Sequence, residues 1–188
     1  VVSLDAGTKS TYEKTKLSPK YEKVLENIAR YSEAGNAGNG GCAVKYIFHK
    51  DNISDDDVIG FSYAMLALRP QEVWLTFDFD PLGSLPADCE DFGGYDYSPH
   101  VEAYAKVFLC LEKHGVKAVH YAEKHLAPAS KHGVILLEMV KTRIEQLRRL
   151  KSESLKLKDF RLNGNSGIPV KDGHFQIDDG KLKIFCND

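Results

Sequence analysis

The sequence lacks closely spaced cysteines. The four cysteines of the 188-residue chain lie far apart, at Cys42, Cys89, Cys110 and Cys186. This spacing excludes the paired thiols that are typical of zinc and iron–sulfur sites, and it is not that of a disulfide scaffold. A chain that uses cysteine in this way is expected in a reducing, cytoplasmic setting.

Long hydrophobic runs and an excess of one charge are also missing. No apolar run approaches the roughly 20 residues that a membrane-spanning helix needs. The formal net charge is -2, which gives no reason to expect a nucleic-acid or membrane partner. Hydrophobic residues make up 43% and charged residues 28%, the composition of an ordinary globular protein. The sequence begins without a methionine or a signal segment, so we expect a fragment or a processed chain.

Strand and helix patterns alternate along residues 1–128. Short apolar segments predict strands at 1–5, 43–48, 72–80 and 116–121. Capping residues and helical spacing predict helices between them, at about 8–16, 18–35, 54–69 and 100–114. This order is typical of parallel βα units in a barrel or a doubly wound sheet. We therefore predict an α/β fold in which residues 1–128 form a partial (β/α) barrel segment with parallel strands.

Two further segments complete the predicted organisation. Residues 129–151 have the apolar period of a long amphipathic helix with a basic outer face. Residues 152–188 predict a small β-rich appendage, with a hairpin at Asp179-Gly180 because this pair suits a tight primed turn. We expect the appendage to pack on the end of the barrel segment. The long polar stretch 81–99 is predicted to be a functional loop.

Polar side chains gather where the predicted strands end. In parallel α/β folds the carboxyl ends of the strands form the active site. Carboxylates, hydroxyls and one lysine in such places can hold a polar ligand with an amine, a carboxylate and a ribose, but they form no nucleophile–base pair. The candidates are Ser3, Asp5 and Thr8, residues 45–52, Thr76, Asp78 and Asp80, and His120 and Glu123.

The segment Val2-Ser3-Leu4-Asp5-Ala6-Gly7-Thr8, followed by Thr11 and Tyr12, resembles the fourth strand of radical S-adenosylmethionine (radical SAM) enzymes. In many of these enzymes a similar strand end precedes a T-x-x-T-Y motif and a basic helix. Residues 24–31, 44–47 and 52–55 are similar to the fourth helix and fifth strand of that superfamily, and 75–80 falls where the sixth strand is expected. The resemblance covers about residues 1–125, and its first motif carries most of it.

The resemblance implies a partial (β/α)₆ barrel that cleaves S-adenosylmethionine reductively on a [4Fe–4S] cluster. Family members hold the cluster with three cysteines of a C-x-x-x-C-x-x-C loop, and this sequence has no such spacing. We therefore expect both groups only in a full-length parent protein that supplies the N-terminal half of the barrel. This chain alone is expected to bind neither group and to be inactive. A small-molecule or peptide substrate is implied, its identity set by loops such as 81–99.

The resemblance also implies which residues face the cofactor. Ser3 and Asp5 match positions that face the ribose and the methionine end of S-adenosylmethionine, and Lys45 matches a position that pairs with its carboxylate. Thr76 and Asp78 match positions that approach the adenine and the substrate. No catalytic residue and no metal ligand is identified in this way.

Other interpretations stay open at this point. Ser3 and Asp5 can instead cap the following helix and stabilise the turn, and Lys45 can point outward between helices if Tyr46 faces inward. A second hypothesis is a metal-dependent hydrolase or lyase on an α/β barrel, because carboxylates at strand ends suit hard cations. Its residues are Asp5, Asp78, Asp80 and His120. A third hypothesis is a non-catalytic binding module.

Overall fold

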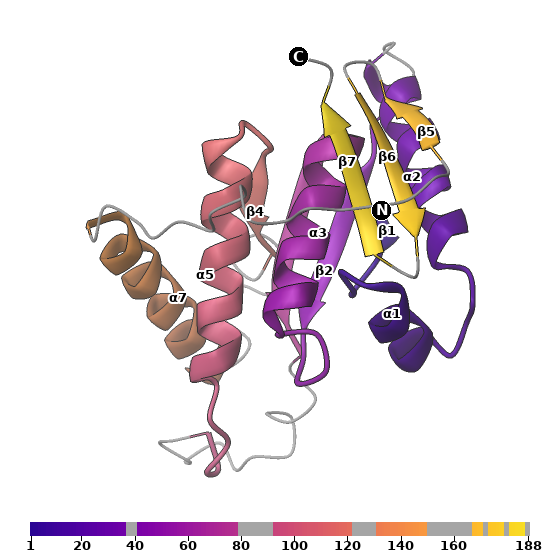
Figure 1. Cartoon of the computed structure of the whole chain (residues 1–188). Helices are drawn as coiled ribbons and strands as arrows, with labels where there is room; N and C mark the ends of the chain where they lie inside the picture. Colours follow the sequence, from indigo (N-terminus) through magenta and orange to yellow (C-terminus); the bar gives the residue numbers. More distant parts are fainter. Residues whose placement is uncertain are drawn as a thin grey trace.

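The computed structural model describes residues 1–36, 41–78, 92–121 and 131–149, and the backbone of three C-terminal strands within 167–186. In chain order the elements are β1 (Val2–Ser3), α1 (Lys9–Lys16), α2 (Tyr21–Asn36), β2 (Ala43–Phe48), α3 (Asp55–Leu68), β3 (Glu72–Phe77), α5 (Ser98–Lys113), β4 (Ala118–His120), α7 (Lys131–Arg149), β5 (Gly167–Val170), β6 (Gly173–Asp178) and β7 (Lys181–Cys186) (Figure 1).

The first four strands form one parallel sheet in the order β1-β2-β3-β4. Ser3 lies opposite Lys45, Lys45 opposite Trp74, and Trp74 opposite Val119. β1, β2 and β3 are therefore each followed by a crossover to the next strand of the sheet. Right-handed crossovers that all step in the same direction place their helices on the same face of a sheet. The α/β class and the parallel pairing are confirmed.

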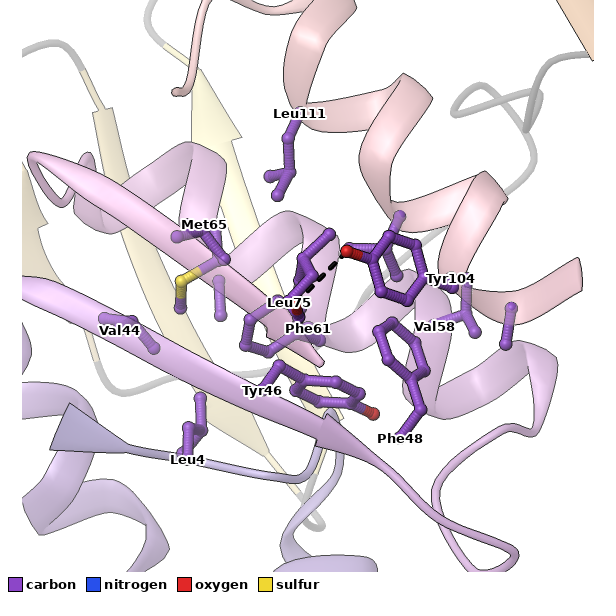
Figure 2. Close-up of a cluster of buried hydrophobic side chains, with 14 of the residues drawn as sticks. Leu4, Val44, Tyr46, Phe48, Val58, Phe61, Met65, Leu75, Tyr104 and Leu111 are labelled. Carbon is purple, nitrogen blue, oxygen red and sulfur yellow. Dashed lines mark hydrogen bonds between the residues drawn. The ribbon is translucent and has the colours of Figure 1, made fainter. Parts of the chain in front are cut away.

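One face of the sheet is packed against the helices. Val44, Tyr46 and Phe48 of β2 and Leu75 of β3 are buried on this face. They contact apolar side chains of the covering helices, and Figure 2 shows the centre of this core, including Val58, Phe61 and Met65 of α3 and Tyr104 and Leu111 of α5. Because side chains alternate along a strand, their neighbours point to the opposite face. We call that opposite face, which carries Ser3, Lys45, Ile47, Trp74 and Thr76, the far face.

The direction of Lys45 follows from that of Tyr46. The Tyr46 ring lies 4.1 Å, centroid to centroid, from Phe61 of α3 and is fully buried between sheet and helices. Lys45 therefore points to the far face. The interpretation that placed Lys45 between helices is wrong, because Tyr46 points toward the helices and its neighbour Lys45 therefore points away from them.

Several predicted helix ends are confirmed by their caps. Thr8 Oγ1 accepts a hydrogen bond from the backbone N–H of Thr11 and so caps α1, and Ser54 caps α3 in the same way. Arg69 ends α3 in a left-handed conformation directly before Pro70. Other ends are displaced: α2 and α5 each begin two or three residues from the predicted start. β3 ends at Phe77, and the predicted continuation through Asp80 lies outside the described residues.

The remaining elements are one long helix and three short strands. α7 packs on α5, and it buries Leu136, Val140 and Ile144 at the spacing of an amphipathic helix. β5, β6 and β7 form an antiparallel sheet, with Asp178 opposite Lys181 as a two-residue hairpin connection requires. The backbones of β6 and β7 lie beside α3 (Figure 1). The domain boundaries predicted near 128 and 151, and residues 79–91 of the predicted loop region, fall outside the described residues.

Within the described ranges, no helix combines the length and the apolar character that crossing a membrane demands.

Candidate functional site

Asp5 lies two residues after the end of β1 and connects β1 to β2. Its backbone has a φ of 47°, in the left-handed region that a non-glycine residue adopts at some cost, and only 3% of its surface is exposed. Oδ1 accepts a hydrogen bond from the Ile47 backbone N–H at 2.8 Å, and Oδ2 accepts from Ser3 Oγ at 2.6 Å and Lys16 Nζ at 2.5 Å. The carboxylate therefore continues the β1–β2 pairing after the β1 backbone has turned away.

The structure thus brings Ser3 and Asp5 together and shows them hydrogen-bonded to each other. Neither caps the following helix, because Thr8 does so. The capping interpretation of these two residues is wrong, and the turn is stabilised through strand pairing instead. Both carboxylate oxygens of Asp5 accept hydrogen bonds from other residues of the protein. The primary role of Asp5 is therefore structural.

Asn52 links the carboxyl ends of β1 and β2 through side-chain hydrogen bonds. Its Nδ2 donates to the backbone oxygens of Asp5 at 3.0 Å and Ile47 at 2.8 Å, while its Oδ1 accepts from the His49 N–H at 2.9 Å. Asn52 is fully buried. This side chain was predicted only as part of a strand-end loop. Its role depends on a contact with Asp5 across 47 positions, which neither local pattern nor spacing reveals.

Asp57 organises the segment that follows β1. Its Oδ1 accepts hydrogen bonds from the backbone N–H groups of Gly7 and Thr8, and its Oδ2 accepts from the hydroxyls of Thr11 and Ser54, all at 2.8–3.1 Å. The capping pattern that predicts the helix at 54–69 includes Asp57, but it does not reveal these contacts with the segment after β1. The motif residues that carry the family resemblance are therefore held by one buried carboxylate of another element.

The far face presents a lysine, two aromatic rings and a buried hydroxyl. Lys45 Nζ lies 5.9 Å from the ring centroid of Tyr121, and the Tyr121 ring lies 5.3 Å from that of Trp74 at 31°. Thr76 is 6% exposed, and its Oγ1 is buried with no hydrogen-bond partner. A buried hydroxyl without a partner costs about 1–3 kcal/mol. A ligand atom that bonded to Thr76 would recover this cost.

Lys45 and Thr76 share this face with Ser3, so three of the five predicted cofactor-facing residues project from the same side of the sheet. Trp74 and Tyr121 were not predicted as site residues. The strand register places both of them near Lys45, because Trp74 lies opposite Lys45 and Tyr121 directly follows β4.

Asp78 lies at the carboxyl end of β3, where its N–H donates to the Phe48 oxygen at 2.9 Å. Its charge acts on the tyrosines that precede α5. Burial, together with the neighbouring Tyr95 and Asp78, raises the pKa of Tyr97 to about 12. Burial is also the main cause of the raised pKa of Tyr95, with Asp78 adding to it. Phe77, the residue before Asp78, packs against Tyr97 with 6.2 Å between the ring centroids, so Asp78 lies near the start of α5.

His120 points to the opposite side of the sheet from Lys45. It is in register with Leu75, its Nδ1 lies 2.7 Å from Tyr104 Oη, and its ring stacks on Phe108 at 4.7 Å and 8°. This packing against α5 separates His120 from Asp5, which follows β1 at the other edge of the sheet.

The metal-site hypothesis receives no support from this arrangement. Asp80, another of its residues, lies outside the described part of the chain, as does the strand-end candidate Glu123. Among the residues that are described, no group of three or more His, Cys, Asp or Glu side chains is placed to hold a metal ion.

Comparison of the chain with protein-family models, with curated proteins and with solved structures finds no match.

Proposed function

We propose that this chain forms the C-terminal part of a radical SAM-type (β/α)₆ barrel, and that its far face belongs to the S-adenosylmethionine and substrate side. One observation carries the proposal: four parallel strands follow one another in sequential order, with helices against one face and Lys45 and Thr76 on the other. In a closed (β/α) barrel the face turned away from the helices is the interior, and ligands enter at the carboxyl ends of the strands.

The far-face residues suit the chemical groups of S-adenosylmethionine. The Lys45 ammonium group is the partner for the carboxylate of the ligand, and a charge-assisted hydrogen bond of this kind is worth about 1.5–3 kcal/mol. The unpartnered Thr76 hydroxyl is the partner for a polar atom of the adenosyl group. Trp74 and Tyr121 add aromatic surface for a planar ring.

At the carboxyl end of β1 we propose different roles for two predicted residues. Ser3 Oγ donates to Asp5 and keeps lone pairs that can accept from a ribose hydroxyl. Asp5 is a positioning residue, because its oxygens hold Ser3, Lys16 and the Ile47 backbone. Asp78 lies beside the start of α5, where the substrate is expected to approach.

The residues of this chain do not fit the [4Fe–4S] cluster. Thiolates ligate iron, and burial raises the pKa of Cys42 and Cys110, which disfavours their thiolate forms. The sequence spacing of the four cysteines is also wrong for the family loop. When bound in a radical SAM enzyme, the cluster supplies the electron for reductive cleavage of S-adenosylmethionine. We assign that step to a preceding half of the barrel and none of it to residues of this chain.

Affinity for S-adenosylmethionine tests this proposal. With the preceding half of the barrel present, we expect Lys45→Ala to weaken binding by about 10- to 100-fold in equilibrium dialysis, because one charge-assisted contact is lost. Thr76→Val should weaken it by a smaller factor. Lys117→Ala is the matched control, since Lys117 precedes β4, is largely exposed and pairs with Glu72. Equal affinity of the wild type and Lys45→Ala would rule out the proposed ligand face.

A further inference from the structure

Three side chains with polar atoms pack together where α5 begins. Tyr95 and Tyr97 precede the helix, and His100 lies in its first turn. The ring centroids are 4.6 Å apart for Tyr95 and Tyr97, 5.5 Å for Tyr95 and His100, and 5.3 Å for Tyr97 and His100. His100 is 3% exposed and Tyr97 2%. The imidazole is therefore enclosed by aromatic rings rather than by water.

Only one nitrogen of this imidazole has a hydrogen-bond partner. Nε2 lies 3.2 Å from Tyr95 Oη, whereas Nδ1 is buried and has none. A neutral imidazole has one donor and one acceptor nitrogen, but an imidazolium has two donors. Protonation of His100 would therefore bury a charge and leave an N–H group without an acceptor, both of which are costly. The packed arrangement suits the neutral form.

The charged groups that face His100 come from three places. Asp96 lies in its own segment, Asp78 follows β3 and His49 follows β2. Burial lowers the pKa of His100 below its ordinary 6.5, and the nearby His49 lowers it further, while the carboxylates of Asp96 and Asp78 oppose both effects.

One further titratable group borders the same cluster. His132, at the start of α7, packs on Phe92 at 5.9 Å between ring centroids. Tyr95 and Tyr97 themselves stay neutral near pH 7, because burial raises the pKa of both phenols. His49 and His132 are thus the neighbouring histidines for which a test of His100 needs controls.

We propose that His100 is a pH-sensitive switch: its neutral imidazole holds residues 92–100 packed beside Asp78, and its protonation releases them. Above pH 6.5 His100 is neutral in both the packed and the released form, so the stability of the packed form does not depend on pH. Below 6.5 the released form binds the extra proton first, and packing weakens as the pH falls toward the lower pKa of the packed form.

The switch adds regulation to the candidate site. Asp78 is one of the residues expected to approach the substrate, so the release of its neighbours would alter that side of the site at acid pH. This consequence rests on the proposed function, whereas the switch itself rests only on the packing and hydrogen bonding of His100.

Hydrogen–deuterium exchange of the peptide that covers 92–101 tests the switch without any ligand. Exchange is compared at about pH 7.5 and about pH 5, after correction for the intrinsic pH dependence of exchange. The wild type should lose protection at the lower pH, by up to about tenfold for each unit by which the pKa of His100 lies below 6.5. His100→Gln, whose side chain does not titrate, should lose the response. His49→Gln and His132→Gln, the matched controls, should keep it.

An unchanged response in folded His100→Gln would overturn the proposal, and so would wild-type protection that is the same at both pH values. If His100→Gln does not fold, the wild type is titrated by NMR. His100 must then titrate below 6.5 and together with the exchange of 92–101, and titration at or above 6.5 contradicts the switch. Because S-adenosylmethionine is absent, these results are independent of the test of the proposed function.

Discussion

The Asp57 carboxylate fixes the motif after β1 through Gly7, Thr8 and Thr11. The two backbone N–H groups and the Thr11 hydroxyl all donate to this one carboxylate, and the Tyr21 hydroxyl donates to the Gly7 oxygen at 2.9 Å. At the scale of single residues, the motif that resembles radical SAM enzymes therefore fixes the turn after β1 against α3. A residue pattern can be characteristic of a family because it shapes a site without touching the ligand.

The close approach of Gly7 to α3 gives a prediction at this scale. A Cβ atom on Gly7 would lie 1.8 Å from the backbone oxygen of Asp57, and backbone atoms cannot move aside as a side chain can. Gly7→Ala should lower the free energy of unfolding by about 2–3 kcal/mol, measured by urea denaturation. Gly41→Ala is the control, because the nearest atoms there belong to the flexible Gln71 side chain, and its effect should stay within about 0.5 kcal/mol. Equal losses in the two variants would contradict this explanation.

The residues that line the far face differ in how far the sequence could predict them. Lys45 and Thr76 follow from alternation within their strands, so their shared face was predictable once the strands were identified. The hydrogen bonds of Asp5 to Ile47 and Lys16, and of Asn52 to Asp5, were not. They join segments that are distant in the sequence, and their geometry depends on the left-handed backbone of Asp5.

At the scale of elements, prediction succeeded where the local signal is strong. The caps at Thr8 and Ser54, and the left-handed Arg69 before Pro70, mark helix ends through contacts within a few residues. β4 is shorter than its apolar pattern suggested, because its pairing with β3 runs only from Ala118 to His120. Strand length is set by the neighbouring strand, which a local pattern does not contain. The packing of His120 on α5 was also not predictable, because it depends on contacts with an element that the local sequence pattern does not contain.

The amphipathic pattern of α7 gives a prediction at the element scale. Leu136 is fully buried between α7 and the rest of the core, whereas Val134, two positions earlier, is 47% exposed. In thermal denaturation, Leu136→Ala should lower the free energy of unfolding by about 2–4 kcal/mol, since it removes buried methyl groups and leaves a cavity. Val134→Ala should change it by about 0.5 kcal/mol or less. If both variants lose the same stability, α7 does not pack through the face described here.

At the scale of the whole molecule, the decisive feature is that the sheet has two unlike faces. One is packed with Tyr46, Phe48 and Leu75 against the helices, and the other carries Lys45 and Thr76. The alternation of strands and helices predicted parallel units but left a barrel and a doubly wound sheet open. Sequential strand order, which depends on long-range pairing, is the order that our proposed barrel requires. The far face is then the interior of our proposed barrel, and the pH-sensitive contact at His100 lies beside its carboxyl end, near Asp78.

Trp74 is the single tryptophan of the chain and lies on the far face beside Tyr121, so its fluorescence reports directly on the proposed ligand side. The central claim predicts that S-adenosylmethionine, titrated to about 1 mM, changes this fluorescence saturably when the preceding half of the barrel is present and its own tryptophans are replaced. Lys45→Ala should shift the midpoint to higher concentration, while Lys117→Ala should not. No saturable change, or a titration curve that Lys45→Ala leaves unaltered, would contradict the claim that the far face binds this ligand.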